Sequence, residues 1–481
     1  MNILLLNPPF LNKYSKSSRS PAVTKSGTIY FPLWLSYAAG VLDKKGYELK
    51  LIDAPAKCMT KEQTLEQIKK FNPALVVIDT STPSINSDLK FTSMIKKNMP
   101  ETKTCLVGTH VSATVQEILP RHSAYVDFIA RHEYDYTLSE IAEVLEGKKN
   151  ITEVLGISYC ENGKLIENTE RPYIENLDEL PFVSEVYKKY LDIKDYFYAH
   201  VSYPTVSIFS SRGCPSKCFY CMYSQVMFGK RYRKRSAKSL FDECIYITEN
   251  FPEVKEILID DDNFAVDQDT VKEFCQMMIE AKIPLKWVVQ CRVTLRYDTM
   301  VLMKKAGCRL VVVGYESGSQ KVLDGMHKGI TLDMSKRFNN AARKAHMRVH
   351  GCFMVGNPGE TKETMMETLE FAKSLKMDTV QFFPLIVYPG TEAYEWADRN
   401  HYITARNYSQ WILPDGTHNC VLSTPEISAE ELVEFCNYAR KKFYLRPQYM
   451  LMKLGECLTS KDDFIRTMKA FETFRKYLFK K

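Results

Sequence analysis

The sequence of 481 residues contains no long hydrophobic run, although 45% of its residues are hydrophobic. No window approaches the roughly eighteen uninterrupted apolar residues that a membrane-spanning helix needs, so such a helix is excluded. Residues 1–9 carry neither a basic leader nor a small-residue cleavage site, so no signal peptide is expected. Without an export signal, the 14 cysteines predict reduced thiols in a cytoplasmic protein rather than disulfides.

The chain also has little excess charge and no dinucleotide-binding motif. Its net charge of +7 is small for this length: the positive sign hints at anionic substrates or surfaces, and the small size gives no sign of nucleic-acid binding. The pattern G-x-G-x-x-G does not follow the first expected strand, which argues against a dinucleotide site. The chain is longer than one hydrophobic core usually supports, so about two or three domains are expected.

The first third of the chain, residues 1–147, alternates short apolar segments with amphipathic ones. This alternation predicts an α/β domain in which helices cover both faces of a parallel sheet. Ligands of such sheets bind at the carboxyl ends of the strands. The expected strands are 3–6, 49–52, 75–78, 103–107 and 128–130, and the expected helices are 32–45, 60–70, 87–98, 112–119 and 136–145.

Polar residues gather in the loops at those carboxyl ends, where a ligand is expected. For one of them, His110, a plain alternative stays open, because polar residues in such loops often cap the next helix. The residues are Asn7 after the first strand, Thr82 after the third, Gly108, Thr109 and His110 after the fourth, and Glu133 after the fifth.

Residues 148–204 are predicted to form a linker. A β-hairpin over 157–160 and 164–167 is expected, because the Asn162-Gly163 pair between them suits a type I′ turn. Residues 172–201 are rich in Pro, Tyr and Asp, and predict an irregular connector on the surface.

Three cysteines, Cys214, Cys218 and Cys221, lie in one tight loop with the spacing C-x3-C-x2-C, after an apolar strand expected at 205–209. Thiolates this close together suit an iron–sulfur cluster or zinc. A closed structural zinc site takes four ligands, whereas three ligands leave one metal position open for chemistry. The alternatives are a zinc loop completed by a distant Cys or His, and a chance grouping.

The motif resembles the signature of the radical S-adenosylmethionine (radical SAM) enzymes. The resemblance implies that the three thiolates hold a four-iron four-sulfur cluster, whose open iron binds SAM and passes the electron that splits it to a deoxyadenosyl radical. It also implies that Tyr220, before the third cysteine, lies near the adenine of SAM. An oxygen-sensitive cluster favours an anaerobic setting.

Residues 205–395 contain six strand–helix units, which match the partial, TIM-like (β/α)6 barrel of that family. Functional groups of such barrels lie at the carboxyl ends of the strands. The expected strands after 205–209 are 256–259, 285–290, 309–313, 348–355 and 379–384. The resemblance implies SAM contacts by Asp261 or Asp262 after the second strand, Arg292 after the third, Glu316 and Ser317 after the fourth, and Gly356 and Pro358 after the fifth.

The first domain resembles the cobalamin-binding domain that precedes the radical SAM core in one subfamily. The resemblance implies a Rossmann-like (flavodoxin-like) fold that binds cobalamin through Asn7, Thr82, Gly108, Thr109, His110 and Glu133. The motif D-x-H-x-x-G is absent, so no histidine from that motif is expected on cobalt. The chain also departs from the subfamily before His110, where Gly108-Thr109 replaces the usual pair of glycines.

Two other stretches have open alternatives. The basic run 230–235 is predicted to be either a solvated loop or a clamp for the SAM carboxylate or an anionic substrate. The C-terminal region, residues 396–481, is expected to be mostly helical, with a capping box at Ser428 and Glu431. Its last helix, 462–479, has an apolar stripe that either packs on the barrel or makes peripheral contact with a membrane.

Over nearly its full length the chain resembles radical SAM enzymes with an N-terminal cobalamin-binding domain. That group includes carbon methylases, the anaerobic magnesium-protoporphyrin monomethyl ester cyclase and hopanoid-associated enzymes. The implied function is methyl transfer from methylcobalamin to an unactivated carbon, in lipid, isoprenoid or secondary metabolism. The alternatives are radical cyclisation, rearrangement or C–C bond formation, and a non-catalytic cobalamin or iron–sulfur sensor. The implied partners are a small-molecule or lipid-like substrate and an electron donor such as flavodoxin or ferredoxin, without nucleic acid.

Overall fold

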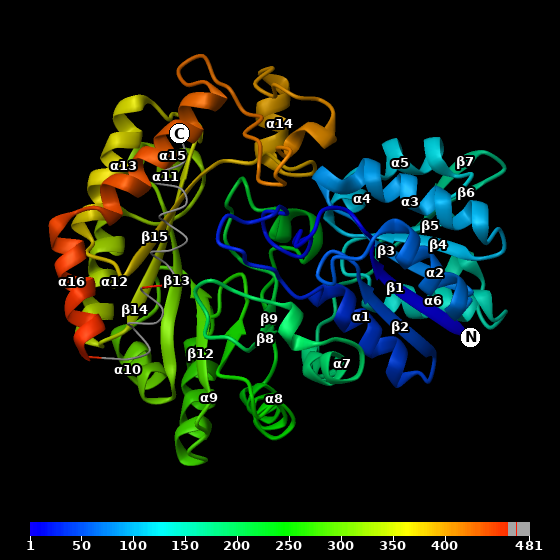
Figure 1. The fold of residues 1–481 in the computed structure, drawn as a ribbon, viewed down its shortest axis with the longest axis horizontal. Helices are drawn as coiled ribbons and strands as arrows, with labels where there is room; N and C mark the ends of the chain where they lie inside the picture. The colour runs from blue at the N-terminus through cyan, green and yellow to red at the C-terminus, as the bar shows by residue number, and fades with distance from the viewer. Residues whose placement is uncertain (460–467, 469–481) are drawn as a thin grey trace.

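The protein is described here by a computed structural model, which covers residues 1–459 and 468. Two sheets, each with its own helices, lie side by side (Figure 1). The N-terminal sheet is on the right in that view, and the barrel-like sheet is on the left. Most C-terminal helices lie over the barrel, and the segment around α14 (Glu392–Arg399) reaches towards the first sheet.

The first sheet has seven strands among the described residues, in the order β2-β1-β3-β4-β5-β6-β7. Strands β1 to β5 pair in parallel, and β6 and β7 are added antiparallel. The order β2-β1-β3-β4-β5 is the flavodoxin-like one, so the predicted fold class is confirmed. The strands are β1 (Asn2–Asn7), β2 (Glu48–Asp53), β3 (Leu75–Asp79), β4 (Lys103–Val107), β5 (Phe128–Ala130), β6 (Ile157–Glu161) and β7 (Lys164–Glu167).

The strands of this sheet carry apolar side chains on both faces, and helices cover each face. In β1, Ile3 and Leu5 pack with one layer, which contains α1 and α6, whereas Leu4 and Leu6 pack with the other, which contains α2, α3 and α5. The single helix expected at 112–119 is instead broken at Thr114. The helices are α1 (Leu33–Lys44), α2 (Lys61–Phe71), α3 (Ile85–Asn98), α4 (Thr109–Ala113), α5 (Val115–His122) and α6 (Asp135–Leu145).

The predicted linker, residues 148–204, is partly joined to the first domain. Its hairpin extends the first sheet, because Tyr159 of β6 pairs with Phe128 of β5. The prediction of a surface connector over 172–201 was wrong: the segment forms α7 (Val183–Tyr190) and buries three tyrosines. Two of them, Tyr187 and Tyr196, stack on Phe31 with ring centroids 4.3 and 4.0 Å away. The divisions at 147, 204 and 395 stay predictions.

The second sheet has six parallel strands among the described residues, in the order β15-β14-β13-β12-β11-β8. The spatial order therefore follows the chain, as in a partial barrel of strand–helix units. The strands are β8 (Thr205–Ile208), β11 (Glu256–Ile259), β12 (Lys286–Cys291), β13 (Cys308–Glu316), β14 (Arg348–Val355) and β15 (Thr379–Pro384). The helices are α8 (Ala237–Asn250), α9 (Gln268–Glu280), α10 (Tyr297–Lys305), α11 (Gln320–Gly325), α12 (Leu332–Lys344) and α13 (Lys362–Ser374).

A long loop between β1 and α1, residues 8–32, lies between the two sheets and is drawn in dark blue in Figure 1; we call it the interdomain loop. Its Lys16 pairs with Asp88 of the first domain at 2.7 Å. Its Arg19 pairs with Asp260 of the barrel, also at 2.7 Å. The loop therefore ties the carboxyl edge of the first sheet to that of the second.

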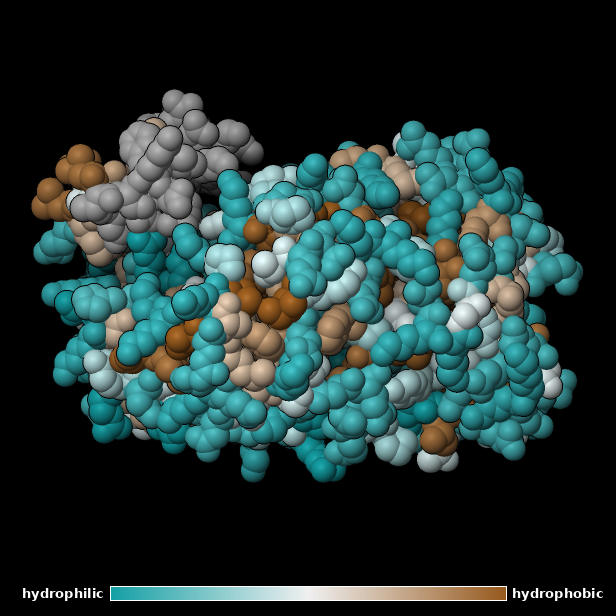
Figure 2. All heavy atoms as spheres, turned by 90° about the horizontal axis from the view of Figure 1, so that it is seen from below, coloured by the Kyte–Doolittle hydropathy of each residue, from teal (hydrophilic) through white to brown (hydrophobic). Residues whose placement is uncertain are grey.

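The C-terminal region packs on the barrel through α15 (Ala429–Tyr444), which begins at the predicted capping box. The next helix, α16 (Pro447–Thr459), exposes apolar side chains, including Leu451 and Leu458. Figure 2 shows apolar side chains at the left edge, where α16 lies in Figure 1. The helix predicted at 462–479 lies outside the described residues apart from Met468. Among the described helices, none is long and apolar enough to cross a membrane.

Candidate functional site

The cysteine loop begins just after β8, at the carboxyl edge of the barrel. Cys214 and Cys218 are 6% and 7% exposed, whereas Lys217 between them faces solvent. Gly213 has a φ of 78°, and a Cβ on it would lie 2.2 Å from the carbonyl oxygen of Arg231. Only glycine fits this turn without displacing the backbone. The loop therefore holds two buried sulfurs behind one solvent-facing turn.

The donor set of this loop, three free thiols, suits an iron–sulfur cluster. Cys214, Cys218 and Cys221 are all free thiols. Among the described residues, no three or more His, Cys, Asp or Glu converge on one metal ion, as a closed zinc site requires. A four-iron cluster needs no such convergence, because its irons are spread between the sulfurs. Burial raises the pKa of the Cys221 thiol to about 11, so iron rather than the surrounding protein must favour its thiolate.

Arg292, at the end of β12, lies beside the cysteine loop. Its Nη1 is 3.5 Å from the Sγ of Cys218, and its Nη2 donates to the carbonyl oxygen of Lys328. Within the described part of the chain, no carboxylate lies within 4.0 Å of this guanidinium. Its charge is therefore available to an anion, which supports the predicted contact with the SAM carboxylate.

A lysine that the sequence analysis missed completes this edge. The Nζ of Lys328 lies 2.6 Å from the Oε1 of Glu316 and 3.0 Å from the hydroxyl of Tyr220, which itself donates to Glu316. Glu316 has a φ of 65°, a conformation that non-glycine residues rarely adopt. A Cβ on Gly314 would lie 2.3 Å from the carboxylate of Glu316. Lys328 could not be predicted as a site residue, because it lies in a Lys-Gly turn after α11 and belongs to no recognisable motif.

Three consecutive aspartates, residues 260–262, follow β11, and the last two have different partners. Asp261 supports the cysteine loop: its carboxylate accepts the N–H groups of Ser210 and Ser211 at 2.8 and 3.2 Å, as well as both hydroxyls. Burial raises the pKa of Asp261 to about 6. Because both of its oxygens are engaged, Asp262 is the better of the two predicted SAM contacts. An oxygen of Asp262 lies 3.2 Å from Arg19.

The motifs after β13 and β14 lie at the same edge of the barrel. The Ser317 hydroxyl is 3.1 Å from that of Thr368, on α13. Gly356 has a φ of 94°, and a Cβ on it would lie 3.0 Å from the side chain of Leu432. Pro358, two residues on, is half-buried. The structure brings Ser317, Gly356 and Pro358 to the predicted place, and their contact with SAM stays a prediction.

The carboxyl edge of the first sheet holds two buried polar atoms without a partner. His110 has its Nδ1 3.1 Å from the hydroxyl of Thr82, whereas its Nε2 is unpartnered. Burial lowers the pKa of His110 to about 3, so the ring is neutral. Asn7 donates to Asp53 at 2.8 Å and leaves its Oδ1 unpartnered. Buried orphan atoms are costly, and a polar ligand such as cobalamin would satisfy them.

The glycine and threonine before His110 shape the same edge. Gly108 has a φ of 114°, and a Cβ on it would lie 2.5 Å from the carbonyl oxygen of Thr80. Thr109 is the first residue of α4. The glycine therefore lets this turn approach the neighbouring loop, and the predicted contacts of Gly108 and Thr109 with cobalamin stay predictions.

Glu133, the last of the predicted cobalamin contacts, is held in two buried ion pairs, and its contact with cobalamin stays a prediction. Its two carboxylate oxygens lie 2.7 Å from Arg212 and 2.7 Å from Arg233, and all three side chains are 2% exposed. The basic run 230–235 is not solvated throughout, because two of its arginines are buried in ion pairs, and a clamp for a ligand stays a prediction. Arg233 and Arg235 are buried in ion pairs with Glu133 and Glu243, whereas Lys230 and Arg231 are exposed.

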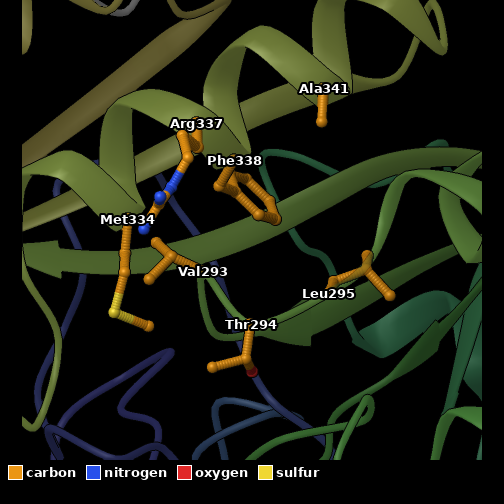
Figure 3. Close-up of a pocket in the computed structure, with 7 residues that line it drawn as sticks. All are labelled: Val293, Thr294, Leu295, Met334, Arg337, Phe338 and Ala341. Atoms are coloured by element: carbon orange, nitrogen blue, oxygen red, sulfur yellow. The ribbon is translucent and has the colours of Figure 1, made fainter.

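A pocket of about 360 Å³ lies between α12 and the loop after β12 (Figure 3). Figure 3 shows Phe338 and Met334 of α12 facing Val293, in the loop after β12. The charged residue at its rim, Arg337, is 72% exposed and pairs with Asp333 of the same helix. None of the predicted cysteine, SAM or cobalamin residues lines this pocket.

Two family profiles match the chain. The profile of the radical SAM superfamily matches residues 208–372, and that of the B12-binding domain matches residues 19–142. The first covers the cysteine loop and the strand ends of the barrel up to β14, and the second covers the polar edge of the first sheet except Asn7.

Full-length relatives share both parts. The chain is 31% identical to an uncharacterized methyltransferase of Pyrococcus horikoshii, over 95% of each chain. It is 26% identical to the anaerobic magnesium-protoporphyrin IX monomethyl ester cyclase of Rubrivivax gelatinosus, over 76% of this chain and 66% of the other. The fold matches that of the radical S-adenosylmethionine methyltransferase TsrM from Kitasatospora setae, solved with cobalamin and an iron–sulfur cluster bound. The TM-score is 0.70 at 16% identity, over 93% of this chain and 89% of the other.

Proposed function

Because the chain belongs to the radical SAM enzymes that carry an N-terminal B12-binding domain, we propose that it transfers a methyl group to an unactivated carbon of a small organic molecule. Its cofactors are a four-iron four-sulfur cluster, SAM and cobalamin. When bound, these groups supply one-electron reduction of SAM and a transferable methyl group. The observation that carries the proposal is the three-cysteine loop beside Arg292, a cation with no carboxylate partner among the described residues.

At the barrel edge, each side chain has a separate task. Cys214, Cys218 and Cys221 hold the cluster, and Arg292 receives the carboxylate of SAM. Lys328 contacts the carboxylate of Glu316 and the hydroxyl of Tyr220, so that both are oriented before SAM arrives. The remaining predicted contacts to SAM are Asp262, Ser317, Gly356 and Pro358.

At the edge of the first sheet, the side chains bind cobalamin without a histidine from D-x-H-x-x-G. The neutral His110 offers its free Nε2, and Thr82 fixes the orientation of the ring from the other side. Asn7 offers its Oδ1 as an acceptor. Gly108 and Thr109 complete the set. The interdomain loop joins the two edges and keeps the two cofactor sites in fixed relation.

The partners follow from what surrounds the cysteine loop. Lys217 and Lys230 are exposed next to the buried sulfurs, which suits an acidic one-electron donor such as flavodoxin or ferredoxin. A lipid-like substrate is supported by α16, where Leu451, Leu454 and Leu458 are exposed beside Lys453. The proposed location is the cytoplasm, with peripheral contact to a membrane through the C-terminal region.

The test uses the reconstituted holoenzyme under anaerobic conditions. The enzyme is given SAM labelled on its methyl carbon, reduced flavodoxin, and an extract of metabolites and lipids from a strain without the gene. We expect 5′-deoxyadenosine and one labelled product that is absent from the extract of the strain without the gene before incubation. Deoxyadenosine formation with a new product that carries no label would contradict methyl transfer.

The second candidate is radical cyclisation or another C–C bond formation without methylation. It is favoured by the similarity to the magnesium-protoporphyrin monomethyl ester cyclase. The same experiment separates the two candidates, because cyclisation leaves the labelled methyl group on methionine. A sensor without catalysis would form no deoxyadenosine with any fraction of the extract.

A further inference from the structure

Glu133 joins the first domain to the cysteine loop through two arginines. Its Oε1 lies 2.7 Å from the Nη1 of Arg212, and its Oε2 lies 2.7 Å from the Nη1 of Arg233. The Oε2 also accepts the backbone N–H of Ile174 at 2.8 Å. Because the three charged side chains are almost fully buried, water does not screen their attraction.

The two arginines stand at the base of the cysteine loop. Arg212 and Arg233 are directly opposite each other in the short antiparallel ladder of β9 (Ser211–Arg212) and β10 (Arg233–Lys234). That ladder closes the segment 213–232, which contains all three cysteines. Cys214 follows Arg212 by two positions, and its N–H donates to the carbonyl oxygen of Gly229 at 3.3 Å. A residue that fixes both arginines therefore fixes both ends of the loop.

The charges of this group balance. Arg212 also pairs with Asp135, with distances of 2.8 and 3.2 Å between nitrogens and oxygens, so that two carboxylates face two guanidiniums. The rings of Trp34, Tyr37 and Phe228 lie 5.5, 5.0 and 5.5 Å from the guanidinium carbon of Arg212. In such apolar surroundings, the loss of one carboxylate leaves an uncompensated positive charge close to Cys214.

We propose that Glu133 is a positioning residue for the iron–sulfur cluster, through which the B12-binding domain sets the place and the local charge of the cysteine loop. The inference rests on the proposed function, because it needs a cluster in that loop. It gives the first domain a task that does not depend on bound cobalamin. The cluster is then sensitive to a substitution in a domain that supplies none of its ligands.

The test variant is Glu133→Gln, because the amide keeps the shape of the side chain, removes its charge and leaves one accepting oxygen in place of two. The matched control is Glu256→Gln. Glu256 is fully buried at the opposite end of the barrel, where it accepts from Arg309 at 2.6 and 2.8 Å and from the N–H of Ser202 at 2.7 Å. Both variants lose one carboxylate from a buried Glu–Arg pair. The measurements are iron content after desalting, the midpoint potential of the cluster and the EPR spectrum of its reduced form.

For Glu133→Gln we expect lower iron content, a changed EPR spectrum and a midpoint potential more positive than that of the wild type. The potential rises because added positive charge near a cluster favours its reduced form. For Glu256→Gln we expect lower thermal stability with the wild-type potential and spectrum. The double variant Glu133→Gln, Arg233→Gln restores the charge balance, so its potential should return towards the wild-type value.

Two results would overturn the inference. One is a Glu133→Gln protein with wild-type iron content and potential that loses cobalamin, which would make Glu133 a corrin contact. The other is an equal shift of potential in both single variants, which general destabilisation would explain. Failure of the proposed function is distinguishable from both, because wild-type protein would then take up no cluster or form no deoxyadenosine.

Discussion

Lys328 holds its Nζ 2.6 Å from the Oε1 of Glu316, and the two side chains are 6% and 7% exposed. The hydroxyl of Tyr220 contacts both groups, so the pair is fully hydrogen-bonded on this side. A buried ion pair of this kind contributes little net stability, but removing one partner leaves the other charge buried alone. The pair therefore keeps a carboxylate in a defined orientation beside the cysteine loop.

The first prediction concerns this pair. Lys328→Met should lower the free energy of unfolding by about 3–5 kcal/mol, because Glu316 loses its buried partner. It should also weaken SAM binding to the reconstituted protein by a factor of about ten or more, measured by isothermal titration. The control is Lys238→Met, which breaks an exposed pair with Asp242 and should cost less than about 1 kcal/mol. An unchanged SAM affinity in Lys328→Met would place SAM away from Glu316.

The second prediction concerns the cluster ligands. Reconstituted wild-type protein should bind about four iron atoms, since three thiolates and one open iron suit such a cluster. Substitution of Cys214, Cys218 and Cys221 by Ala should abolish both the cluster absorbance and SAM cleavage. A buried cysteine outside the loop, Cys275, is the control and should be replaceable by Ala without loss of iron. SAM cleavage by the triple variant would refute the assignment.

The third prediction concerns cobalamin. Protein loaded with hydroxocobalamin and desalted should retain corrin absorbance, and the EPR spectrum of its Co(II) form should show no imidazole nitrogen from a D-x-H-x-x-G motif. His110→Ala should weaken retention without changing that spectrum. Thr82→Val should act in the same direction, because it removes the hydroxyl that orients the ring. A nitrogen splitting that disappears in His110→Ala would instead make His110 a cobalt ligand.

The fourth prediction concerns pH. Burial raises the pKa of Asp79 to about 7, from an ordinary value of 3.8. Between about pH 4 and pH 7, Asp79 is therefore protonated in the folded state and ionised in the unfolded state. The contribution of Asp79 to the free energy of unfolding is largest below about pH 4 and decreases as the pH rises to about 7. Each pKa unit corresponds to about 1.4 kcal/mol. Asp79→Asn should remove this decline, so that the variant gains stability over the wild type as the pH rises.

A carboxylate whose pKa is shifted in the opposite direction serves as the control for this prediction. Asp127 is partly buried, but Lys96 at 2.7 Å and the N–H of Thr104 lower its pKa below the ordinary value. Its contribution is present above about pH 4 and is lost as the pH falls through its folded pKa. In urea unfolding series, Asp127→Asn should therefore lose stability relative to the wild type most at neutral pH. Parallel curves for the two variants would show that at least one of the two predicted signs is wrong.

The strands and most helices were predictable because their causes are local. The strand β3 is buried at all five positions, and the first four of them are apolar. Helix α2 begins at Thr60 with a capping box formed by residues three positions apart. By contrast, α7 was missed because its buried face, with Val183, Val186 and Tyr187, lies in a stretch dominated by Pro, Tyr and Asp. Packing against Phe31, far away in the chain, decides its burial.

By itself, the sequence determined the alternation of strands and helices and the spacing of Cys214, Cys218 and Cys221, because burial periodicity and a tight loop are properties of neighbouring residues. Only the tertiary structure decided that Glu133 meets Arg212, 79 positions away, and that Arg19 meets Asp260, 241 positions away. Parallel strands gather loops from distant parts of the chain at one edge, and charge pairing then depends on which loops face each other across two sheets. Local patterns contain no information on that arrangement, which is why the pairing of Glu133 with the two arginines at the base of the cysteine loop could not be predicted.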